Sequence, residues 1–401
     1  MQILVCNVGS TSLKYKMFEM PFETELCRGG IEKVGTETAF SYFQAKGADR
    51  VESIMNIADQ TAAIGRMVDC LTSTNARVLE SLGSLDAIAF KVVGADGISG
   101  TVILDEAVLN SMEVHTPLLP CHNPPYIEAI RIFARLVPHV PLIGLFETTF
   151  HGSLPEAAYT YGVPSRWKNE LHLRRYGYHG ASFTYINEQA AKVISQPGND
   201  FKLIVCHLGG SSSICAIRNG KSIDTSMGMS NQAGVSMSNR CGDLDPFLLL
   251  YVMDRLELTT NQMREELTTN GGLAGISEMG GDVQELELAA SKGHKGAQRA
   301  LEVYSYEVKK YIGAYAAALG GLDALIFTGG IGENGCNMRA RICDGLKFLG
   351  IEIHMELNKV QSETKKISPG DANVPVWVIP TNEEIVVARS ALGVLRNSGR
   401  V

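Results

Sequence analysis

The chain has 401 residues, of which 45% are hydrophobic and 41 are glycine, and its formal net charge is −7. This length allows about two to three domains of ordinary size, and the composition is typical of a loop-rich α/β enzyme with well-filled cores. The modest negative charge and the absence of a basic run argue against nucleic acid or an anionic membrane as a partner.

The first predicted element is a β-hairpin over residues 3–14. Its apolar run breaks at Asn7, turns at Gly9 among hydroxyl side chains and then becomes apolar again. Glycine lets the backbone approach an anion closely, and the loop N–H groups and hydroxyls can donate to the anion's oxygens. The hairpin therefore predicts a phosphate-sized loop, although a single copy could be an ordinary turn.

The same design recurs over residues 203–215, with His207 and Gly209 in the places of Asn7 and Gly9. A repeat that matches in register points to a duplicated domain rather than to two unrelated turns.

Between the two hairpins, residues 18–43 predict further strands, and residues 54–82 show helical periodicity. Residues 85–96 predict a buried strand that ends in a Gly-containing turn, with Lys91 inside the apolar run. Such a lysine either reaches an edge of the sheet or lies where an anion compensates its charge.

Residues 117–126 contain four prolines around His122 and Asn123, which predicts a stiff loop before a helix over 126–136. His122 could be satisfied by local backbone or could belong to a site. Residues 140–146 predict a buried strand that ends at Glu147. Ligands of open α/β sheets bind at the carboxyl ends of strands, so Glu147 is a candidate site residue.

Residues 174–180 place two arginines and His179 in a Gly-broken turn before a helix near Ser182, which fits an anion site. Asn219-Gly220 predicts a tight hairpin turn, and Pro246 predicts the start of a helix. Arg240 lies in a turn of small residues, where it either pairs with Asp243 or clamps an anion.

Residues 246–318 are predicted to be mostly helical. Residues 322–334 predict a buried strand that runs into a glycine-rich turn able to hold a nucleotide, followed by a helix from about Asn337. A strand over 374–379, a polar exit at 381–384 and a helix over 385–395 complete the predicted order.

The nine cysteines are an odd number and lack metal-binding spacing, so they indicate free thiols in a reducing compartment. No signal peptide and no stretch of about 18 uncharged apolar residues is present. These features predict a cytoplasmic protein.

Seven motifs, spread in order over nearly the whole chain, resemble those of the acetate kinase family, a branch of the actin, sugar kinase and heat-shock ATPase superfamily. They are Asn-x-Gly-Ser-x-Ser-x-Lys at 7–14, His-Asn-Pro-Pro at 122–125, Arg-Arg-Tyr-Gly-Tyr-His-Gly at 174–180, Asp-Thr-Ser-Met-Gly at 224–228, Arg-x-Gly-Asp-x-Asp-Pro at 240–246, Gly-Gly-Ile-Gly-Glu-Asn at 329–334 and Thr-Asn-Glu-Glu at 381–384.

The resemblance implies an α/β fold of two duplicated ribonuclease H-like domains, of the actin-like ATPase type, with a cleft between them. It implies a first domain of residues 1–148 closed by the C-terminal helix of 385–401, and a second domain of 149–384 that carries the nucleotide-binding turn. It also implies Mg²⁺-dependent, reversible phosphoryl transfer between ATP and a short carboxylate, acetate by default, giving ADP and an acyl phosphate. A homodimer is implied as well.

Site roles follow from the same resemblance. The catalytic residues would be Glu147, His179 and Arg240. The carboxylate substrate would contact Lys91, Val93, Cys121, His122, Tyr178 and Asn231. The nucleotide and phosphates would contact Ser10, Ser12, Lys14, His207, Gly209, Gly210, Ser211, Asp282, Gly330, Ile331, Gly332 and Asn334. Mg²⁺ would be held by Asn7 and Glu383.

The chain departs from the family pattern at several of these positions. Residues 90–96 read Phe-Lys-Val-Val-Gly-Ala-Asp where the family usually has His-Arg-Val-Val-His-Gly-Gly, so Lys91 stands for an arginine. Glu147 stands for aspartate, Gly210 for the asparagine of the phosphate loop, and Gln284 for a cation near the adenine. In the acyl pocket, Cys121, Tyr178 and Asn231 stand for leucine, phenylalanine and proline.

These departures leave two alternatives open. The first is an acyl kinase that uses pyrophosphate or phosphate, suggested by Gln284 and the altered loop but opposed by the intact turn at 329–334. The second is a nucleotide-binding regulator without turnover, opposed by the retention of Asn7, His179, Arg240 and Glu383.

Overall fold

The first predicted hairpin forms strands β1 (Gln2–Gly9) and β2 (Ser12–Glu19) in the computed structural model, which describes residues 1–73, 78–194 and 200–399. The chain divides into two compact units, Met1–Thr149 with Asn382–Val401 and Phe150–Thr381. They are called the first and the second unit below.

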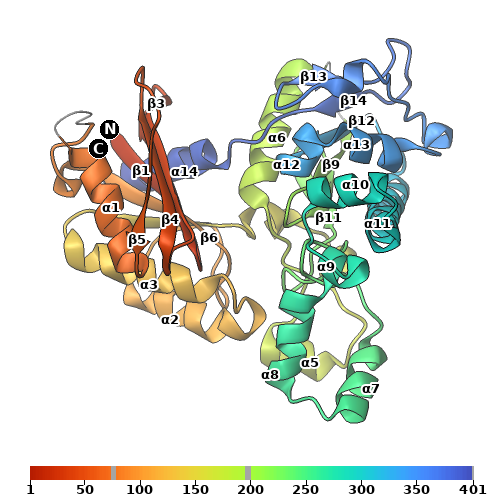
Figure 1. The fold of residues 1–401 in the computed structure, drawn as a ribbon, viewed down its shortest axis with the longest axis horizontal. Coiled ribbons are helices and arrows are strands. Elements are labelled where there is room, and N and C mark those ends of the chain that lie inside the picture. The colour runs from red at the N-terminus through yellow and green to blue at the C-terminus, as the bar shows by residue number, and fades with distance from the viewer. Residues whose placement is uncertain (74–77, 195–199, 400–401) are drawn as a thin grey trace. The chain divides into compact units, whose positions relative to one another are not determined.

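The first unit contains an eight-stranded sheet in the order β5-β4-β3-β2-β1-β6-β8-β7 (Figure 1). Strands β1 to β5 form an antiparallel meander, β6 and β8 continue it in parallel, and β7 returns at the edge. The further strands are β3 (Thr24–Glu32), β4 (Thr36–Ala45), β5 (Val51–Ile57), β6 (Ala87–Val92), β7 (Thr101–Ile103) and β8 (Leu142–Phe146). The helices are α1 (Gln60–Thr72), α2 (Glu106–His115), α3 (Asn123–Leu136) and α14 (Glu383–Asn397).

Neighbouring residues of β6 show which helices cover which face of this sheet. The Phe90 ring packs edge-on against Phe133 of α3, with 5.6 Å between ring centroids. Lys91, the next residue, pairs with Glu383 of α14. Because successive side chains of a strand point to opposite faces, α3 and α14 lie on opposite sides of the sheet. Lys91 is thereby directed toward the first turn of α14.

The second unit contains a six-stranded sheet in the order β11-β10-β9-β12-β14-β13. Its strands are β9 (Lys202–His207), β10 (Ser213–Arg218), β11 (Lys221–Thr225), β12 (Ala324–Thr328), β13 (Lys365–Lys366) and β14 (Val376–Val378). Its helices are α4 (Glu156–Tyr159), α5 (Ser165–Leu171), α6 (Gly180–Val193), α7 (Pro246–Leu256), α8 (Thr260–Glu265), α9 (Gly272–Ser277), α10 (Val283–Ser291), α11 (Lys295–Leu319), α12 (Gly329–Asn334) and α13 (Cys336–Cys343). The shorter helical turns of the two units together are η1 (Leu82–Ser84), η2 (Thr116–Leu118), η3 (Thr149–Ser153), η4 (Glu266–Asn270), η5 (Lys347–Leu349) and η6 (Leu357–Lys359).

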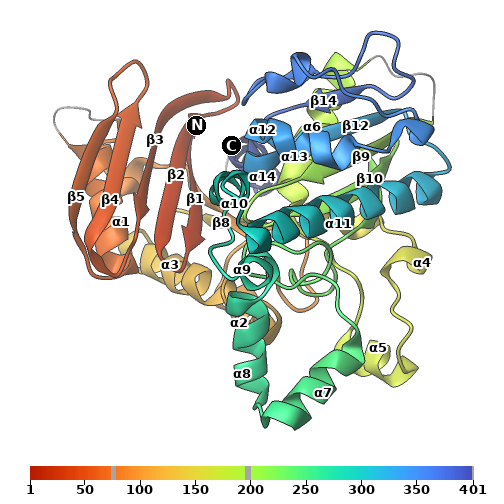
Figure 2. The ribbon, with the colours of Figure 1, turned by 45° about the vertical axis from the view of Figure 1, so that its right-hand side comes forward.

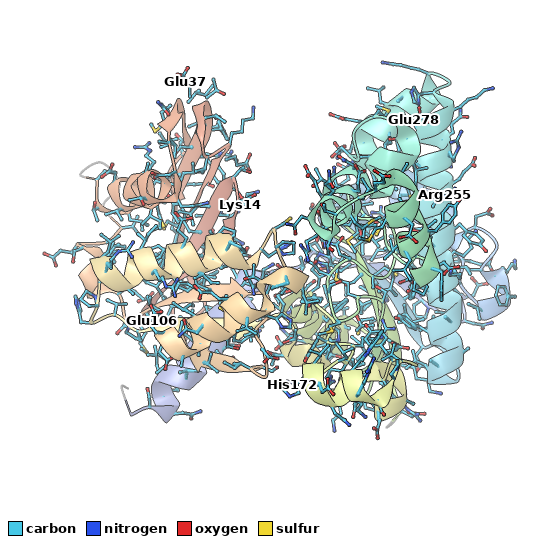
Figure 3. The ribbon with its side chains drawn as sticks, turned by 90° about the horizontal axis from the view of Figure 1, so that it is seen from below. Lys14, Glu37, Glu106, His172, Arg255 and Glu278 are labelled. Carbon is cyan, nitrogen blue, oxygen red and sulfur yellow. The ribbon has the colours of Figure 1, made fainter. Side chains whose placement is uncertain are left out.

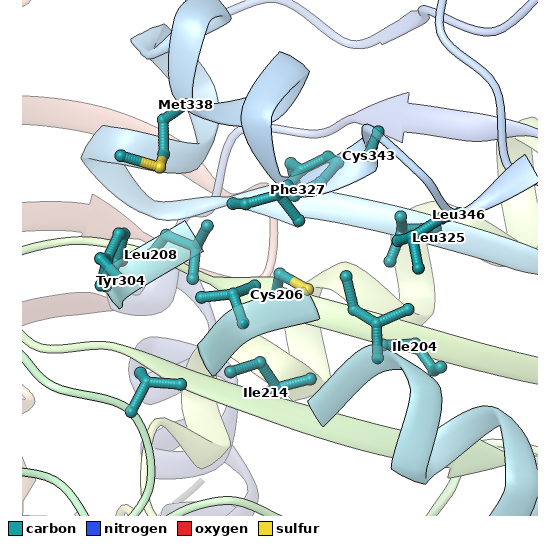
Figure 4. Close-up of a cluster of buried hydrophobic side chains, with 14 of the residues drawn as sticks. Ile204, Cys206, Leu208, Ile214, Tyr304, Leu325, Phe327, Met338, Cys343 and Leu346 are labelled. Carbon is teal, nitrogen blue, oxygen red and sulfur yellow. The ribbon is translucent and has the colours of Figure 1, made fainter. Parts of the chain in front are cut away.

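Both faces of the second sheet are covered. Ile204, Cys206 and Leu208 pack into a cluster with residues of β12 and α11, among them Phe327 and Tyr304 (Figure 4). The 25-residue helix α11 runs along this face (Figure 2). The alternate residues of β9 pack in a second cluster that includes Phe183 of α6. A strand buried on both faces is a near-continuous apolar run, which is why residues 203–206 contain no polar side chain.

The two units repeat one pattern of strand pairing. Strand β1 pairs antiparallel with β2 and parallel with β6, and β9 pairs antiparallel with β10 and parallel with β12. The duplicated hairpins predicted from the sequence are therefore confirmed. The turn at Asn219-Gly220 is also confirmed, because both residues have positive φ, 51° and 77°.

Three predicted elements were wrong in part. Residues 54–57 belong to strand β5, helix α1 spans only Gln60–Thr72, and residues 78–81 are not helical. Residues 74–77 of the predicted helix lie outside the described residues. Asn123, Pro124 and Pro125 form the first turn of α3, where proline needs no backbone donor, rather than a loop.

The third error concerns residues 329–334, which form helix α12 and not a turn. Among residues 1–73, 78–194 and 200–399, no helix is long and apolar enough to cross a membrane.

Candidate active site

The turn of the first hairpin is closed by backbone pairing of Gly9 with Ser12. Gln60 donates to the Gly9 carbonyl at 2.7 Å, which ties the turn to α1. Ser10 is exposed, and Lys14 of β2 forms a surface ion pair with Glu32 at 3.0 Å (Figure 3). The predicted phosphate residues Ser10, Ser12 and Lys14 are thus brought together on one hairpin.

The side chain of Asn7, in β1, contacts the first turn of α14. Its Nδ2 donates to Glu384 Oε1 at 3.0 Å, and Lys16 Nζ lies 3.1 Å from Glu384 Oε2. Glu384 is therefore the carboxylate that Asn7 contacts, and it is the neighbour of Glu383, which the resemblance implied as a magnesium ligand. Both glutamates occupy the first turn of α14, where the helix dipole favours negative charge.

The Asn7 Oδ1 atom is buried and has no hydrogen-bond partner in the described parts of the chain. A buried, unpaired carbonyl oxygen is unfavourable unless a ligand satisfies it. Together with the carboxylates of Glu383 and Glu384, it supplies the oxygen ligands that Mg²⁺ prefers. The described residues contain no group of three His, Cys, Asp or Glu side chains that could hold a metal, and Mg²⁺ is usually bound by one or two carboxylates with waters and substrate phosphates. The donor set fits.

Lys91 forms an ion pair with Glu383 Oε2. Burial alone would lower the pKa of Lys91, but the carboxylates of Glu383 and Glu147 outweigh burial and raise this pKa above its usual value. An anion therefore compensates the charge of Lys91, and that anion is a carboxylate of the same unit.

Glu147 directly follows β8 and is 4% exposed. Its backbone N–H donates to the Val92 carbonyl at 2.9 Å, so the ends of β6 and β8 are joined. Tyr126 of α3 is buried close to Lys91. Burial raises the pKa of the Tyr126 hydroxyl, and the charge of Lys91 opposes that rise. Sequence reasoning missed Tyr126.

The remaining predicted substrate residues of the first unit are Val93, which is buried, Cys121, which is exposed, and His122, which immediately precedes α3. At Gly94, where the family pattern has histidine, a larger residue would require neighbouring side chains to move. A Cβ atom there would lie 2.9 Å from Leu119 and 3.2 Å from His115. These side chains fill the space.

Two histidines distant in sequence meet in the second unit. The rings of His179 and His207 are stacked, with centroids 4.2 Å apart and planes inclined by 22°. His207 ends β9, and His179, with φ of 60°, precedes α6. His179 Nδ1 lies 2.8 Å from Ser213 Oγ, and His207 Nδ1 lies 2.8 Å from Ser182 Oγ. Each ring is therefore oriented by a serine.

The two arginines of the same turn do not provide a prepared anion site. Arg175 donates to the carbonyls of Thr225, Ser226 and Met227 at 3.0 to 3.3 Å. Arg174 stacks over the ring of Tyr159 at 4.2 Å. Both guanidinium groups serve structural contacts.

Arg240 donates from Nη1 to the carbonyl of Asn231 at 2.8 Å, so two predicted site residues are in contact. Asp243, the partner considered for Arg240, accepts from the Gly234 N–H at 2.9 Å and from the Tyr311 hydroxyl. Tyr178 is buried and donates to the Met229 carbonyl at 2.6 Å.

The predicted nucleotide segment packs against the second phosphate loop. The Leu208 carbonyl accepts from the N–H groups of Ile331 and Gly332 at 2.8 and 3.1 Å. Gly329 has φ of 76°, and a Cβ atom there would lie 2.6 Å from the Leu208 oxygen. Only glycine fits this position. Gly330, in contrast, faces open space.

The other predicted phosphate and nucleoside residues have local partners. Ser212, the neighbour of Ser211, donates to the Gly209 carbonyl at 2.9 Å, and Gly210 is exposed. Asn334 donates to the Gly330 carbonyl at 3.1 Å. Asp282 caps α10 by accepting from the Gln284 N–H at 2.8 Å.

Sequence reasoning missed Ser182, Glu333 and Thr381, which contact these residues. A sequence signal was available for two of them, because Glu333 and Thr381 lie inside two of the seven motifs.

The comparisons with known proteins agree with one another. The model of the Acetokinase family matches residues 2–389. An acetate kinase of Natranaerobius thermophilus is 40% identical over 98% of this chain and 100% of that protein, and one of Dictyoglomus turgidum is 42% identical over 98% of each.

Solved structures show the same relationship. The Porphyromonas gingivalis acetate kinase superposes with a TM-score of 0.87 at 34% identity, covering 98% of this chain and 99% of that one. A propionate kinase from Francisella tularensis gives 0.88 at 33% identity, covering 97% and 98%. The fold of two duplicated actin-like ATPase domains is confirmed. The chain belongs to the acetokinase family and is a carboxylate kinase, a phosphotransferase with a carboxyl group as acceptor.

Proposed function

We propose that the protein transfers a phosphoryl group reversibly between ATP and a short-chain carboxylate, acetate by default, with Mg²⁺, giving ADP and an acyl phosphate. The observation that carries the proposal is the full-length similarity to proteins named acetate kinase. The Francisella tularensis relative is named a propionate kinase, so a somewhat larger acid is kept within the proposal.

The proposed roles follow from what phosphoryl transfer requires, which is mainly positioning and positive charge on the transferring group. His179 and Arg240 stabilise that group, and Glu147 is assigned as the third catalytic residue. The stacked ring of His207 and the second loop, with Gly209, Gly210 and Ser211, hold phosphate oxygens. The geometry supports the role of His207, because its ring stacks on His179 and the carbonyl of the next residue, Leu208, accepts from two N–H groups of α12.

The nucleoside is assigned to Asp282 and to Gly330, Ile331, Gly332 and Asn334. Two N–H groups of this segment already donate to Leu208, so the proposed contact is close packing against Gly330, whose Cβ direction is open. Ser10, Ser12 and Lys14 are assigned to the phosphates from the first hairpin. Contacts with the carboxylate substrate are assigned to Lys91, Val93, Cys121, His122, Tyr178 and Asn231.

Mg²⁺ is assigned to Asn7 and Glu383, with Glu384 beside them. When bound, the metal would neutralise charge on the phosphate oxygens. Asn7 Oδ1 is the oxygen best prepared for it, because that atom is buried and unsatisfied in the described structure.

A coupled assay tests the proposed function. ATP, GTP and pyrophosphate are each offered as donors with acetate, propionate and butyrate, and acyl phosphate is measured. We expect turnover with ATP, and GTP within about tenfold, because Gln284 supplies no cation to the base. Turnover with pyrophosphate alone would favour the first alternative, and nucleotide binding without turnover would favour the regulator.

Lys91→Arg is expected to lower the KM for acetate about tenfold, with kcat kept or raised. A guanidinium can hold a carboxylate through two parallel hydrogen bonds, whereas an ammonium supplies charge without that geometry. Initial rates for acetate, propionate and butyrate in both proteins measure the effect.

The control for Lys91→Arg is Lys347→Arg, an exposed lysine paired with Glu352. If Lys91 serves a larger acid, arginine should raise the KM for that acid while lowering it for acetate. Unchanged KM values for every acid would show that Lys91 does not face the substrate.

We further propose that the two compact units are the two domains, with boundaries near 148 and 384. A cytoplasmic location is proposed from the nine free cysteines. A homodimer is proposed from α7, on which Phe247, Leu250 and Tyr251 are more than half exposed. Light scattering on the intact chain tests the dimer, and a monomeric mass at micromolar concentration would contradict it.

A further inference from the structure

A chain of hydrogen bonds behind His207 has no role in the function proposed above. Ser182, in the first turn of α6, is fully buried and lies 2.8 Å from His207 Nδ1. Thr381 donates from Oγ1 to Ser182 Oγ at 3.0 Å. The Thr381 N–H in turn donates to Glu333 Oε1 at 3.0 Å. Glu333 is a residue of α12, the proposed nucleotide segment.

The direction of these bonds fixes where the protons lie. A hydroxyl carries one proton and accepts through its oxygen. Because Ser182 Oγ accepts from Thr381, its own proton remains to be donated, and His207 Nδ1 is the neighbouring acceptor. A protonated Nδ1 would leave the buried Ser182 proton without an acceptor in this chain of bonds, and a buried unmade hydrogen bond is unfavourable.

We propose that Ser182 and Thr381 are positioning residues that hold His207 as a neutral imidazole with its proton on Nε2. Both imidazolium and the opposite tautomer require an N–H at Nδ1, where Ser182 already donates. His207 therefore presents a fixed N–H donor from Nε2.

The neutral state of His207 would help phosphoryl transfer, a role that rests on the proposed function. His179 is stacked on His207 at 4.2 Å, and two imidazolium rings at this distance would repel each other. A neutral His207 lets His179 carry positive charge beside the transferring phosphoryl group. His207 then contributes a directed hydrogen bond and no charge.

Glu333 connects this arrangement to the nucleotide segment. Its Oε1 also accepts from the Gly329 N–H at 3.0 Å, so one carboxylate oxygen holds both the start of α12 and Thr381. A shift of α12 would move Thr381 and, through Ser182, the ring of His207. The two proposed nucleotide contacts, α12 and His207, are therefore held in one geometry.

Nitrogen NMR of the full-length protein with ¹⁵N-labelled histidine tests the inference. The signals of His207 are assigned by difference with a His207→Asn variant. In the wild-type protein at neutral pH we expect an unprotonated Nδ1 and a protonated Nε2. A protonated Nδ1, as tautomer or imidazolium, would overturn the proposal.

Thr381→Val removes the donor to Ser182 and nearly keeps the side-chain shape. Ser182 can then accept from Nδ1–H, so a mixture of tautomers is expected, while Thr381→Ser keeps the hydroxyl and should retain the wild-type signals. Identical spectra for the valine variant and the wild type would remove Thr381 from the proposal.

Activity provides the second measurement. Ser182→Ala and Thr381→Val are expected to lower kcat about tenfold, the scale of one hydrogen bond, with little change in the KM for the carboxylate. Thr381→Ser should restore kcat to within about twofold of the wild type. If the NMR result holds and the protein has no kinase activity, the proposed function fails while the tautomer assignment stands.

Discussion

Arg240→Ala is expected to lower kcat by a factor on the order of 10³ and to leave nucleotide affinity within a few-fold. A guanidinium directed at the moving phosphoryl group stabilises charge that develops in the transition state, so its loss affects turnover far more than ground-state binding. Single-turnover rates and nucleotide titrations on the same preparation measure the two quantities. Equal, small effects on both would rule out the proposed role.

Two further variants separate chemistry from folding. Arg240→Lys keeps the charge and loses the bidentate fork, so only partial activity is expected. Arg299→Ala removes an exposed arginine of α11 and should match the wild type. Because Arg240 also donates to the Asn231 carbonyl, the thermal midpoint of the alanine variant must be compared with that of the wild type.

Local sequence signals predicted most of the fold. The two hairpins, the turn at Asn219-Gly220 and the helix start at Pro246 depend on residues close together in the chain, and all were confirmed. Residues 54–57 were assigned to the wrong element because a short apolar run has no clear period, and only pairing with β4 makes it a strand.

Helix α12 could not be predicted from local signals, because four of its six residues, three glycines and Asn334, are typical of a turn. Its N–H groups are satisfied by Leu208, more than a hundred residues earlier, and by Glu333. Such tertiary contacts override the low helix propensity of glycine.

The site was predictable in its residue types but not in its pairings. Lys91 was recognised as a buried cation, yet its partner Glu383 lies 292 residues away. The arginines of residues 174–180 looked like anion ligands, whereas Arg175 holds backbone carbonyls. Ser182 gave no separate signal, because a serine at a helix start is an ordinary choice, whereas Thr381 lay inside one of the seven motifs.

The second large effect is expected for Arg339→Leu, which should lower the thermal midpoint by about 6–12 °C. Arg339 of α13 is completely buried, and its guanidinium donates to the carbonyls of Gly332 and Glu333 at 2.8 and 2.9 Å. It also donates to Asn358 Oδ1 at 2.8 Å and to the Val360 carbonyl at 3.0 Å. Arg339 thus donates hydrogen bonds to the carbonyl groups at the C-terminal end of α12.

Leucine fills part of the volume but leaves these acceptors without a donor. Each unsatisfied buried carbonyl is unfavourable by about 1–3 kcal/mol, so a total loss of at least about 3 kcal/mol is expected. For a unit of this size, 1 kcal/mol corresponds to roughly 2–4 °C in the midpoint. Because α12 is the proposed nucleotide segment, ATP should also stabilise the variant less than it stabilises the wild type.

Arg341→Leu is the matched control for this prediction, since Arg341 lies two residues later on α13 and is exposed. Its midpoint should stay within about 2 °C of the wild type, as is usual for surface substitutions. The thermal midpoint of Arg339→Lys should lie between those of Arg339→Leu and the wild type. An ammonium keeps the charge but cannot reach all the carbonyls to which the planar guanidinium donates. If Arg339→Leu and Arg341→Leu melt at the same temperature, the carbonyl end of α12 does not depend on Arg339.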